Sequence, residues 1–120
     1  MRILIVDDHA DTAKMMTRWL GALGHEVQSA LCAADALSAV PVGGPFDVVL
    51  CDLTLPDIGG ADLLPRLRAA GCSAPVVAVS GHAGAGATER SLAAGFAAHV
   101  AKPVDLDALT ELLGRVCAAA

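Results

Sequence analysis

The chain has 120 residues, of which 55% are hydrophobic, and a formal net charge of −5 from 13 acidic and 8 basic side chains. This length suits one domain around a single core, no apolar run approaches the roughly 18 residues of a membrane span, and MRILIVDD does not resemble a signal peptide. The eight basic residues are scattered, which argues against direct nucleic-acid binding, so we expect one soluble, cytoplasmic domain over residues 1–120 with no membrane partner.

Five short apolar runs predict five strands. They are residues 3–6 (ILIV), 25–30 (HEVQSA), 46–50 (FDVVL), 75–79 (PVVAV) and 97–101 (AAHVA). The first, third and fourth runs are apolar without alternation, as expected for strands that are covered on both faces of a sheet.

The stretches between these runs predict five helices. They are residues 11–23, 33–40, 60–70, 85–94 and 105–117. In the first of them, Met16, Leu20 and Leu23 recur at helical spacing before Gly24, whereas PVGGP at 41–45 indicates a surface loop. Because strand and helix alternate five times, we predict a doubly wound α/β fold with a parallel sheet between two layers of helices.

The four cysteines of the chain are at positions 32, 51, 72 and 117, and no pair has the CxxC spacing. Cys51 lies inside an apolar run. We interpret the four as reduced, mostly buried thiols of a cytosolic protein rather than as metal ligands or disulfides.

Polar side chains follow four of the predicted strands. Asp7 and Asp8 follow the first strand, Asp52 the third, Ser80 the fourth, and Lys102 comes just beyond the fifth. The carboxyl ends of parallel strands meet at one edge of the sheet, where open α/β sheets bind their ligands. We therefore expect three carboxylates, a hydroxyl and an ammonium group to lie together there.

This set of groups suits the transfer of a phosphoryl group. Clustered carboxylates repel one another, and Mg²⁺ relieves that repulsion because it prefers oxygen ligands. Such an ion also shields an incoming phosphoryl group from the attacking carboxylate. Lysine and serine can contact phosphoryl oxygens, and an aspartate so placed can act as a nucleophile that forms an aspartyl phosphate.

The segments ILIVDDH, DLTLPDIGG, VVAVSGHA and AKPV, in this order, resemble the receiver domain of the two-component response regulator family over all 120 residues. The resemblance implies a flavodoxin-like (βα)5 fold with strand order 2-1-3-4-5. It also implies a phosphorylation-activated switch that receives its phosphoryl group from a histidine kinase or a histidine phosphotransfer protein. Such a switch is no enzyme beyond its own phosphotransfer and autodephosphorylation. As a monomer or a phosphorylation-dependent dimer, it would present an altered fourth helix, fifth strand and fifth helix to a downstream protein target.

The resemblance also assigns the acidic residues of the site. Asp52 would accept the phosphoryl group. Asp8, Asp52 and the backbone carbonyl of Thr54 would hold Mg²⁺, and Asp7 would assist through water.

The remaining roles fall after the fourth and fifth strands. Lys102 would pair with the carboxylate and then with the phosphoryl group, Ser80 would bond a phosphoryl oxygen and move inward, and the Lys102–Pro103 bond would be cis. The sequence departs from the family where a tyrosine or phenylalanine commonly rotates as a switch, since GFAAHVAKP places His99 there. His99 is either a switch residue or an ordinary half-buried strand histidine.

Simpler interpretations compete with these roles. Asp7 and Asp8 could cap the first helix, but a cap does not explain Asp52. His9, directly after the acidic pair, is interpreted as a solvated residue at the rim of the site, and His82 as an exposed loop residue.

Two other functions stay open. An aspartyl-phosphate-forming phosphatase would use the same nucleophile, but the first strand carries no DxDxT run. A phosphate-independent scaffold would not need the acidic residues and the lysine. Because the chain starts at Met1 and ends soon after the fifth predicted helix, a stand-alone regulator is the direct interpretation. The receiver of a hybrid histidine kinase, which VSGHA and AGFAAHVAKPVD resemble, is the alternative.

Overall fold

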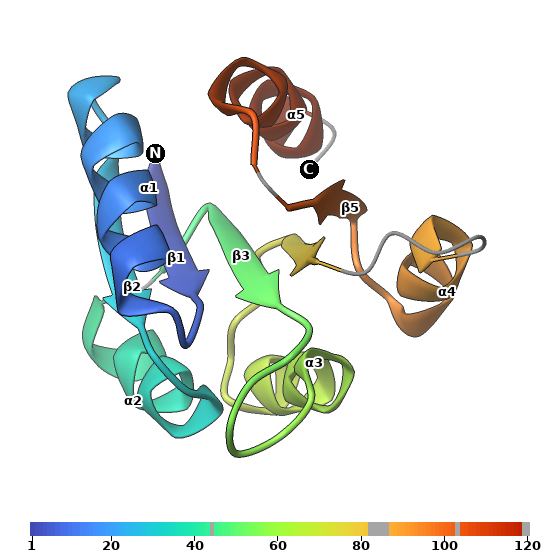
Figure 1. Cartoon of the computed structure of the whole chain (residues 1–120). Coiled ribbons are helices and arrows are strands. Elements are labelled where there is room, and N and C mark those ends of the chain that lie inside the picture. The colour runs from blue at the N-terminus through green and yellow to red at the C-terminus, as the bar shows by residue number, and fades with distance from the viewer. Residues whose placement is uncertain (44, 82–86, 103, 119–120) are drawn as a thin grey trace.

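Strands and helices alternate in the computed structural model, which describes residues 1–43, 45–81, 87–102 and 104–118 (Figure 1). The strands are β1 (Arg2–Val6), β2 (Glu26–Ala30), β3 (Val48–Asp52), β4 (Val76–Ser80) and β5 (Ala98–Ala101). The helices are α1 (Ala10–Ala22), α2 (Ala33–Gly43), α3 (Gly60–Ala69), α4 (Ala87–Ala94) and α5 (Leu106–Ala118). The predicted α/β fold is confirmed.

The five strands form one parallel sheet in the order β2-β1-β3-β4-β5. The chain begins inside the sheet, adds β2 at one edge, and then crosses back to build the other half from β3 to β5. The strand order therefore reverses between β1 and β3, and a crevice at the carboxyl ends of these two strands is where such a sheet binds ligands. This order confirms the prediction.

The three central strands are buried on both faces of the sheet, while the edge strands β2 and β5 are only partly covered. Side chains alternate between the faces, so Ile3 and Ile5 of β1 pack with α1 and α5. Leu4 and Val6 pack on the other face with α2 and α3. Figure 1 shows α1 and α5 on one side of the sheet and α2 and α3 on the other. Strands that are buried on both faces therefore support the residues at their carboxyl ends.

The second helix is longer than the sequence predicted, because α2 continues through residues 41–43. The prediction of a loop at 41–45 is wrong for those three residues. Pro41 removes only one hydrogen bond in the last turn, and Gly43 is buried against the side chains of Gln28 and Phe46. Packing against Gln28 of β2 and against Phe46, which precedes β3, holds the helix end in place.

The cysteines described by the structure are free thiols: Cys51 and Cys72 are buried and Cys32 is partly exposed. Burial raises the pKa of the Cys51 thiol to about 12, and the neighbouring carboxylates of Asp52 and Asp7 add to the rise. Such a thiol is unreactive near neutral pH. Among the described residues, no helix combines the length and apolar character needed to cross a bilayer.

Candidate functional site

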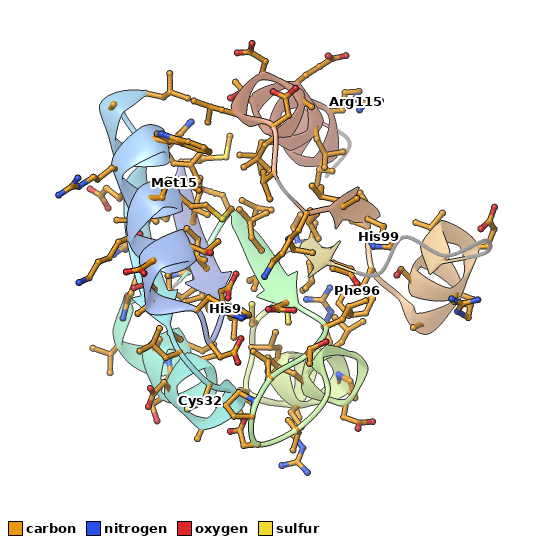
Figure 2. All side chains as sticks on the ribbon, viewed as in Figure 1. His9, Met15, Cys32, Phe96, His99 and Arg115 are labelled. Atoms are coloured by element: carbon orange, nitrogen blue, oxygen red, sulfur yellow. The ribbon has the colours of Figure 1, made fainter. Side chains whose placement is uncertain are left out.

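The carboxyl ends of four strands bring polar side chains to one edge of the sheet. Asp7 follows β1, Asp52 ends β3, Ser80 ends β4 and Lys102 follows β5. Asp7, Asp52 and Ser80 are each at most 4% exposed. Figure 2 labels His9, which lies at the carboxyl end of β1 beside these groups. The structure therefore brings together the residues that the sequence placed at strand ends, while their chemical roles stay predictions.

Both carboxylate oxygens of Asp52 have partners. The backbone N–H of Thr54 donates to Oδ1 at 2.9 Å, and the ammonium group of Lys102 donates to Oδ2 at 3.0 Å. The strand itself is anchored just beyond this residue, where the N–H of Leu53 donates to the carbonyl of Val79 at 3.1 Å. Asp52 is thus held rigidly at the end of a buried strand, with its carboxylate directed at the site.

Lys102 bridges two carboxylates of the site. Its Nζ lies 3.1 Å from Asp7 Oδ2 and 3.0 Å from Asp52 Oδ2, and its side chain is 21% exposed. Its backbone N–H donates to the carbonyl of Ser80 at 2.8 Å, which ties the start of the next loop to β4. Burial lowers the pKa of Lys102, but the hydrogen bonds and negative charges of Asp52 and Asp7 outweigh it, so the pKa is raised. Lys102 is therefore charged at neutral pH.

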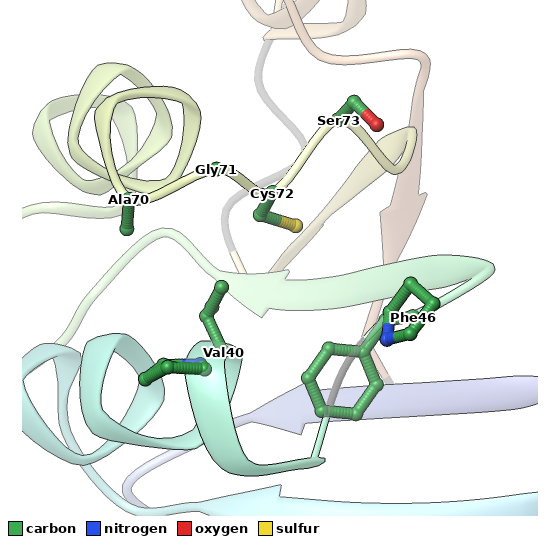
Figure 3. Close-up of a pocket in the computed structure, with 8 residues that line it drawn as sticks. Val40, Phe46, Ala70, Gly71, Cys72 and Ser73 are labelled. Carbon is green, nitrogen blue, oxygen red and sulfur yellow. The ribbon is translucent and has the colours of Figure 1, made fainter.

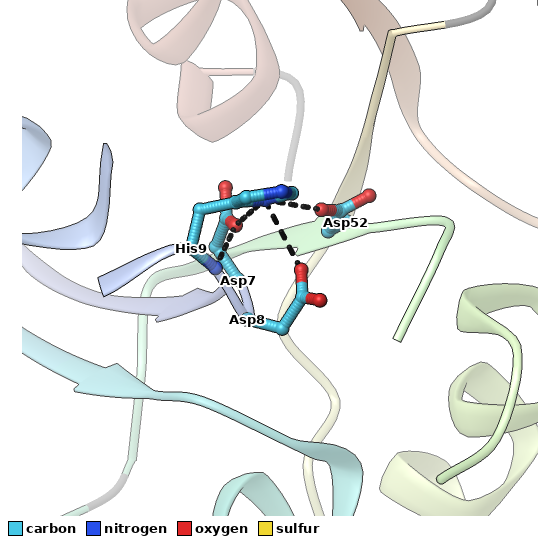
Figure 4. A group of neighbouring side chains, drawn as sticks. All are labelled: Asp7, Asp8, His9 and Asp52. Carbon is cyan, nitrogen blue, oxygen red and sulfur yellow. Dashed lines mark hydrogen bonds and ion pairs between the residues drawn. The ribbon is translucent and has the colours of Figure 1, made fainter. Parts of the chain in front are cut away.

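The sequence argument placed His9 at the rim of the site, and the structure aims its ring at the acidic residues (Figure 4). Its Nδ1 lies 3.1 Å from Asp7 Oδ1, 3.2 Å from Asp8 Oδ1 and 3.9 Å from Asp52 Oδ2, although its side chain is 65% exposed. Its backbone N–H also donates to Asp7 Oδ1 at 2.9 Å. The signal that the sequence offered was its position directly after the acidic pair.

The donor set fits a divalent cation. Asp7, Asp8, His9 and Asp52 each offer one ligand atom, and these four atoms lie within 4.8 Å of one another. Three of the four donors are carboxylate oxygens, which are the ligands that Mg²⁺ prefers. Asp8 is the least buried of the three carboxylates, with a side chain 33% exposed against 4% for each of the others, so an ion can enter from that side. The predicted role of the Thr54 carbonyl stays a prediction.

Sequence reasoning missed Asp57, which anchors the loop between β3 and α3. Its Oδ1 and Oδ2 accept the backbone N–H groups of Ala33 and Ala34, both at 3.0 Å, and Oδ1 also accepts the N–H of Ile58 at 3.0 Å. The hydrogen bonds from Ala33 and Ala34 lower the pKa of Asp57. An acidic residue is favourable at a helix N-terminus. Hydrogen bonds therefore hold the loop that carries Thr54 at two places: at Asp52 through the N–H of Thr54, and at the start of α2 through Asp57.

His99 lies on β5 (Figure 2) and lines two cavities, both of them also lined by residues of α5 and one of them by Leu92 of α4. Two cavities, of about 450 and 300 Å³, include His99 and Arg115 in their walls. Both ring nitrogens of His99 are buried, and neither has a hydrogen-bond partner among the residues that the structure describes. A switch role for His99 stays a prediction, while His82 and the predicted cis bond to Pro103 fall outside the described residues.

A further cavity, of about 270 Å³, lies near the amino ends of the strands, away from the carboxyl ends that carry the acidic residues (Figure 3). Its walls come from the end of α2, the segment before β3 and the turn before β4, including Val40, Phe46 and Cys72. These segments precede their strands, whereas the acidic residues follow theirs. This cavity is therefore separate from the acidic site.

Comparisons with known proteins show which family the sequence and the fold resemble. A family model described as the response regulator receiver domain matches residues 3–114. Sensor histidine kinase RcsC of Salmonella typhi is 37% identical over 113 residues, which cover 94% of this chain and 12% of that protein. Swarming motility regulation protein RssB of Serratia marcescens is 36% identical over 116 residues, which cover 97% of this chain and 51% of that protein.

Among solved structures, a response regulator receiver domain protein (CheY-like) from Methanospirillum hungatei JF-1 is similar over most of both chains. The TM-score is 0.87 at 30% sequence identity, and the match covers 98% of this chain and 94% of that one. The chain thus matches nearly the whole of this receiver structure, but it spans about half of RssB and a small part of RcsC.

Proposed function

The chain belongs to the response regulator receiver family, and on that basis we propose that Asp52 accepts a phosphoryl group from a phosphohistidine of a histidine kinase or a histidine phosphotransfer protein. One observation carries this proposal. Asp52 is a buried carboxylate at the end of β3 that contacts Lys102 and lies beside Asp7 and Asp8. A structural turn aspartate would not need this set of partners.

The proposed transfer is a single displacement at phosphorus. An oxygen of Asp52 attacks the phosphorus, the phosphorus–nitrogen bond of the donor breaks, and the donor imidazole leaves with the electron pair and takes up a proton. Lys102, which contacts Asp52 Oδ2 at 3.0 Å, follows the charge from the carboxylate to a phosphoryl oxygen. Mg²⁺, held by Asp8, Asp52 and the Thr54 carbonyl, would neutralise negative charge on the phosphoryl group. Attack by water on the aspartyl phosphate later returns free phosphate and ends the signal.

We further propose that the phosphate is reported on the face formed by α4, β5 and α5. Ser80 would donate its hydroxyl to a phosphoryl oxygen and move toward it. The cavities beside His99 supply room for its ring to change position. Because no group of the described residues hydrogen-bonds to its ring nitrogens, the movement breaks no hydrogen bond to them. A downstream protein that binds one form of this face would read the phosphorylation state.

The two relatives suggest two settings for this exchange. RcsC is a sensor histidine kinase of which the chain covers 12%, and RssB is a motility regulation protein of which it covers 51%. The proposal fits a receiver of a hybrid kinase and a separate regulator equally. The free cysteines agree with a reducing, cytoplasmic compartment. Apart from its own phosphotransfer and autodephosphorylation, the proposal assigns the chain no enzymatic turnover.

The experiment is to incubate the protein with Mg²⁺ and acetyl phosphate and to measure its intact mass. We expect an adduct of one phosphoryl group in the wild type and none in Asp52→Asn. A wild type without an adduct would favour a phosphate-independent scaffold. Continuous release of phosphate from phosphomonoesters would favour a phosphatase, and light scattering on both forms would show whether phosphorylation changes a monomer into a dimer.

A further inference from the structure

His9 precedes the first residue of α1, at the N-cap position, but its side chain does not cap the helix with a hydrogen bond. Its backbone N–H is fixed on Asp7 Oδ1 at 2.9 Å, and its Nδ1 points at the same oxygen from 3.1 Å. The backbone therefore positions the imidazole over the acidic residues, and the ring serves the site instead of the helix.

The distances around Nδ1 match those between ligands of one metal ion. Protein ligands lie about 2.0 to 2.2 Å from a small divalent ion, so neighbouring ligand atoms are roughly 3.0 to 3.5 Å apart. Nδ1 lies 3.1 Å from Asp7 Oδ1 and 3.2 Å from Asp8 Oδ1, and 3.9 Å from Asp52 Oδ2. Figure 4 shows the ring nitrogen of His9 facing the carboxylates of Asp7, Asp8 and Asp52. All four ligand atoms lie within 4.8 Å of one another, so one ion can be shared by Nδ1 and carboxylates of the site.

A proton on Nδ1 does not prevent His9 from binding a metal ion through that nitrogen. Carboxylates only accept hydrogen bonds, so without a metal the ring places N–H at Nδ1, facing Asp7. A neutral imidazole can instead carry its proton on Nε2, and the 65% exposed side chain lets Nε2–H donate to water. In that tautomer the Nδ1 lone pair is available to a cation.

We propose that His9 is a direct ligand of this site for borderline divalent transition metals, the class that includes Ni²⁺, Co²⁺ and Zn²⁺. Imidazole nitrogen suits these ions, whereas Mg²⁺ favours carboxylate oxygen and retains its waters. With Mg²⁺ bound, the carboxylates and water would supply the ligands and His9 would not be required. With Ni²⁺ bound, Nδ1 coordinates together with the carboxylates of Asp8 and Asp52. The proposal rests on the metal site of the proposed function and adds to it a residue that decides metal preference.

The test compares Ni²⁺ and Mg²⁺ binding by titration calorimetry in the wild type and in His9→Asn. Asparagine keeps a polar atom near the place of Nδ1 but lacks the imidazole nitrogen. We expect Ni²⁺ affinity to fall by about tenfold or more, a loss typical of altered metal sites, while Mg²⁺ affinity changes by less than about threefold. An unchanged ratio of Ni²⁺ to Mg²⁺ affinity would overturn the proposal.

A matched histidine control is His25, whose Nδ1 lies 3.2 Å from the amino group of Met1 and could bind Ni²⁺ elsewhere. His25→Asn should leave the main binding event unchanged, and a loss that follows His25 and not His9 would also overturn the proposal. A measurement on the wild type avoids any folding defect of a variant. With ¹⁵N-labelled histidine, Zn²⁺ should shift the Nδ1 resonance of His9 and Mg²⁺ should not.

Failure of this inference and failure of the proposed function are distinguishable. If the wild type gains no phosphoryl adduct with Mg²⁺ and acetyl phosphate, the proposed function fails. If the adduct forms on Asp52 but Ni²⁺ affinity does not depend on His9, the receiver function stands and the assignment of His9 is wrong.

Discussion

Lys102 offers the sharpest test of how the site is held together. Lys102→Met keeps a side chain of similar length and removes the ammonium group from between Asp7 and Asp52. With Nζ to oxygen distances of 3.1 and 3.0 Å, the gross Coulomb attraction is about 5 kcal/mol for each contact at an effective dielectric constant of about 20. Desolvation of the charged groups offsets most of this attraction.

The net loss is estimated from the behaviour of buried pairs. Removing one partner of a buried ion pair costs about 3 to 5 kcal/mol, because the other charge is left uncompensated. The Lys102 side chain is 21% exposed, so water replaces part of the lost interaction. We expect the free energy of unfolding to fall by about 2 to 3 kcal/mol without metal.

Urea unfolding with EDTA and with Mg²⁺ measures this loss. Mg²⁺ should stabilise Lys102→Met more than the wild type, since the lysine no longer competes with the cation for the carboxylates. A tenfold tighter affinity would add about 1.4 kcal/mol at saturating metal. The same stability for variant and wild type in EDTA would refute the reasoning, and so would equal stabilisation of both by Mg²⁺.

The pH dependence gives an independent check. The pKa of Lys102 is raised above its ordinary value of 10.5, so the stability that it contributes is complete below that value. It is lost as the pH rises through the higher folded value. The difference between wild type and Lys102→Met should therefore be constant near neutral pH and shrink only above pH 10.5. A difference that vanishes between pH 6 and 8 would point to another cause.

Two further predictions concern the loop and the thiols. Asp57→Asn should weaken Mg²⁺ binding several-fold, because the loop that carries Thr54 loses one of the two oxygens that accept N–H groups at the start of α2. The control Asp105→Asn removes a negative charge at the start of α5 and should leave Mg²⁺ binding unchanged in calorimetry. Since the pKa of Asp57 is lowered from 3.8, its contribution to thermal stability should be present above that pH and disappear as the pH falls through the lower folded value. Iodoacetamide at pH 8 should label Cys32 and spare Cys51, because burial raises the pKa of Cys51 to about 12. Peptide mapping measures the labelling of each cysteine. Equal labelling of both in the folded protein would contradict the burial of Cys51.

The predicted elements and the site edge could be inferred because both depend on local patterns. Apolar runs ended at polar residues, and parallel strands bring their carboxyl ends together independently of the conformation of the loops. The end of α2 could not be inferred in the same way. Pro41 and Gly43 disfavour a helix locally, but burial of Gly43 against Gln28 and Phe46 outweighs that preference.

The sequence did not reveal Asp57, and for His9 it gave the position at the rim of the site but not the direction of the ring. Asp57 acts through N–H groups that lie 23 and 24 residues earlier in the chain, and no local motif links these segments. His9 was visible as a neighbour of the acidic pair, but its ring could equally have pointed into water. The tertiary structure decides that Nδ1 faces the carboxylates, with the backbone N–H of His9 donating to Asp7 Oδ1.

The sequence by itself determined which elements form, because the periodicity of apolar residues and the breaks between them are properties of the chain alone. It also determined which chemical groups stand at the strand ends, and so the family and the class of chemistry. The tertiary structure decided the contacts among those groups: Lys102 between Asp7 and Asp52, His9 over the acidic residues, and Asp57 across to α2. Such contacts depend on distances of a few ångströms between distant segments, which packing sets and residue order does not.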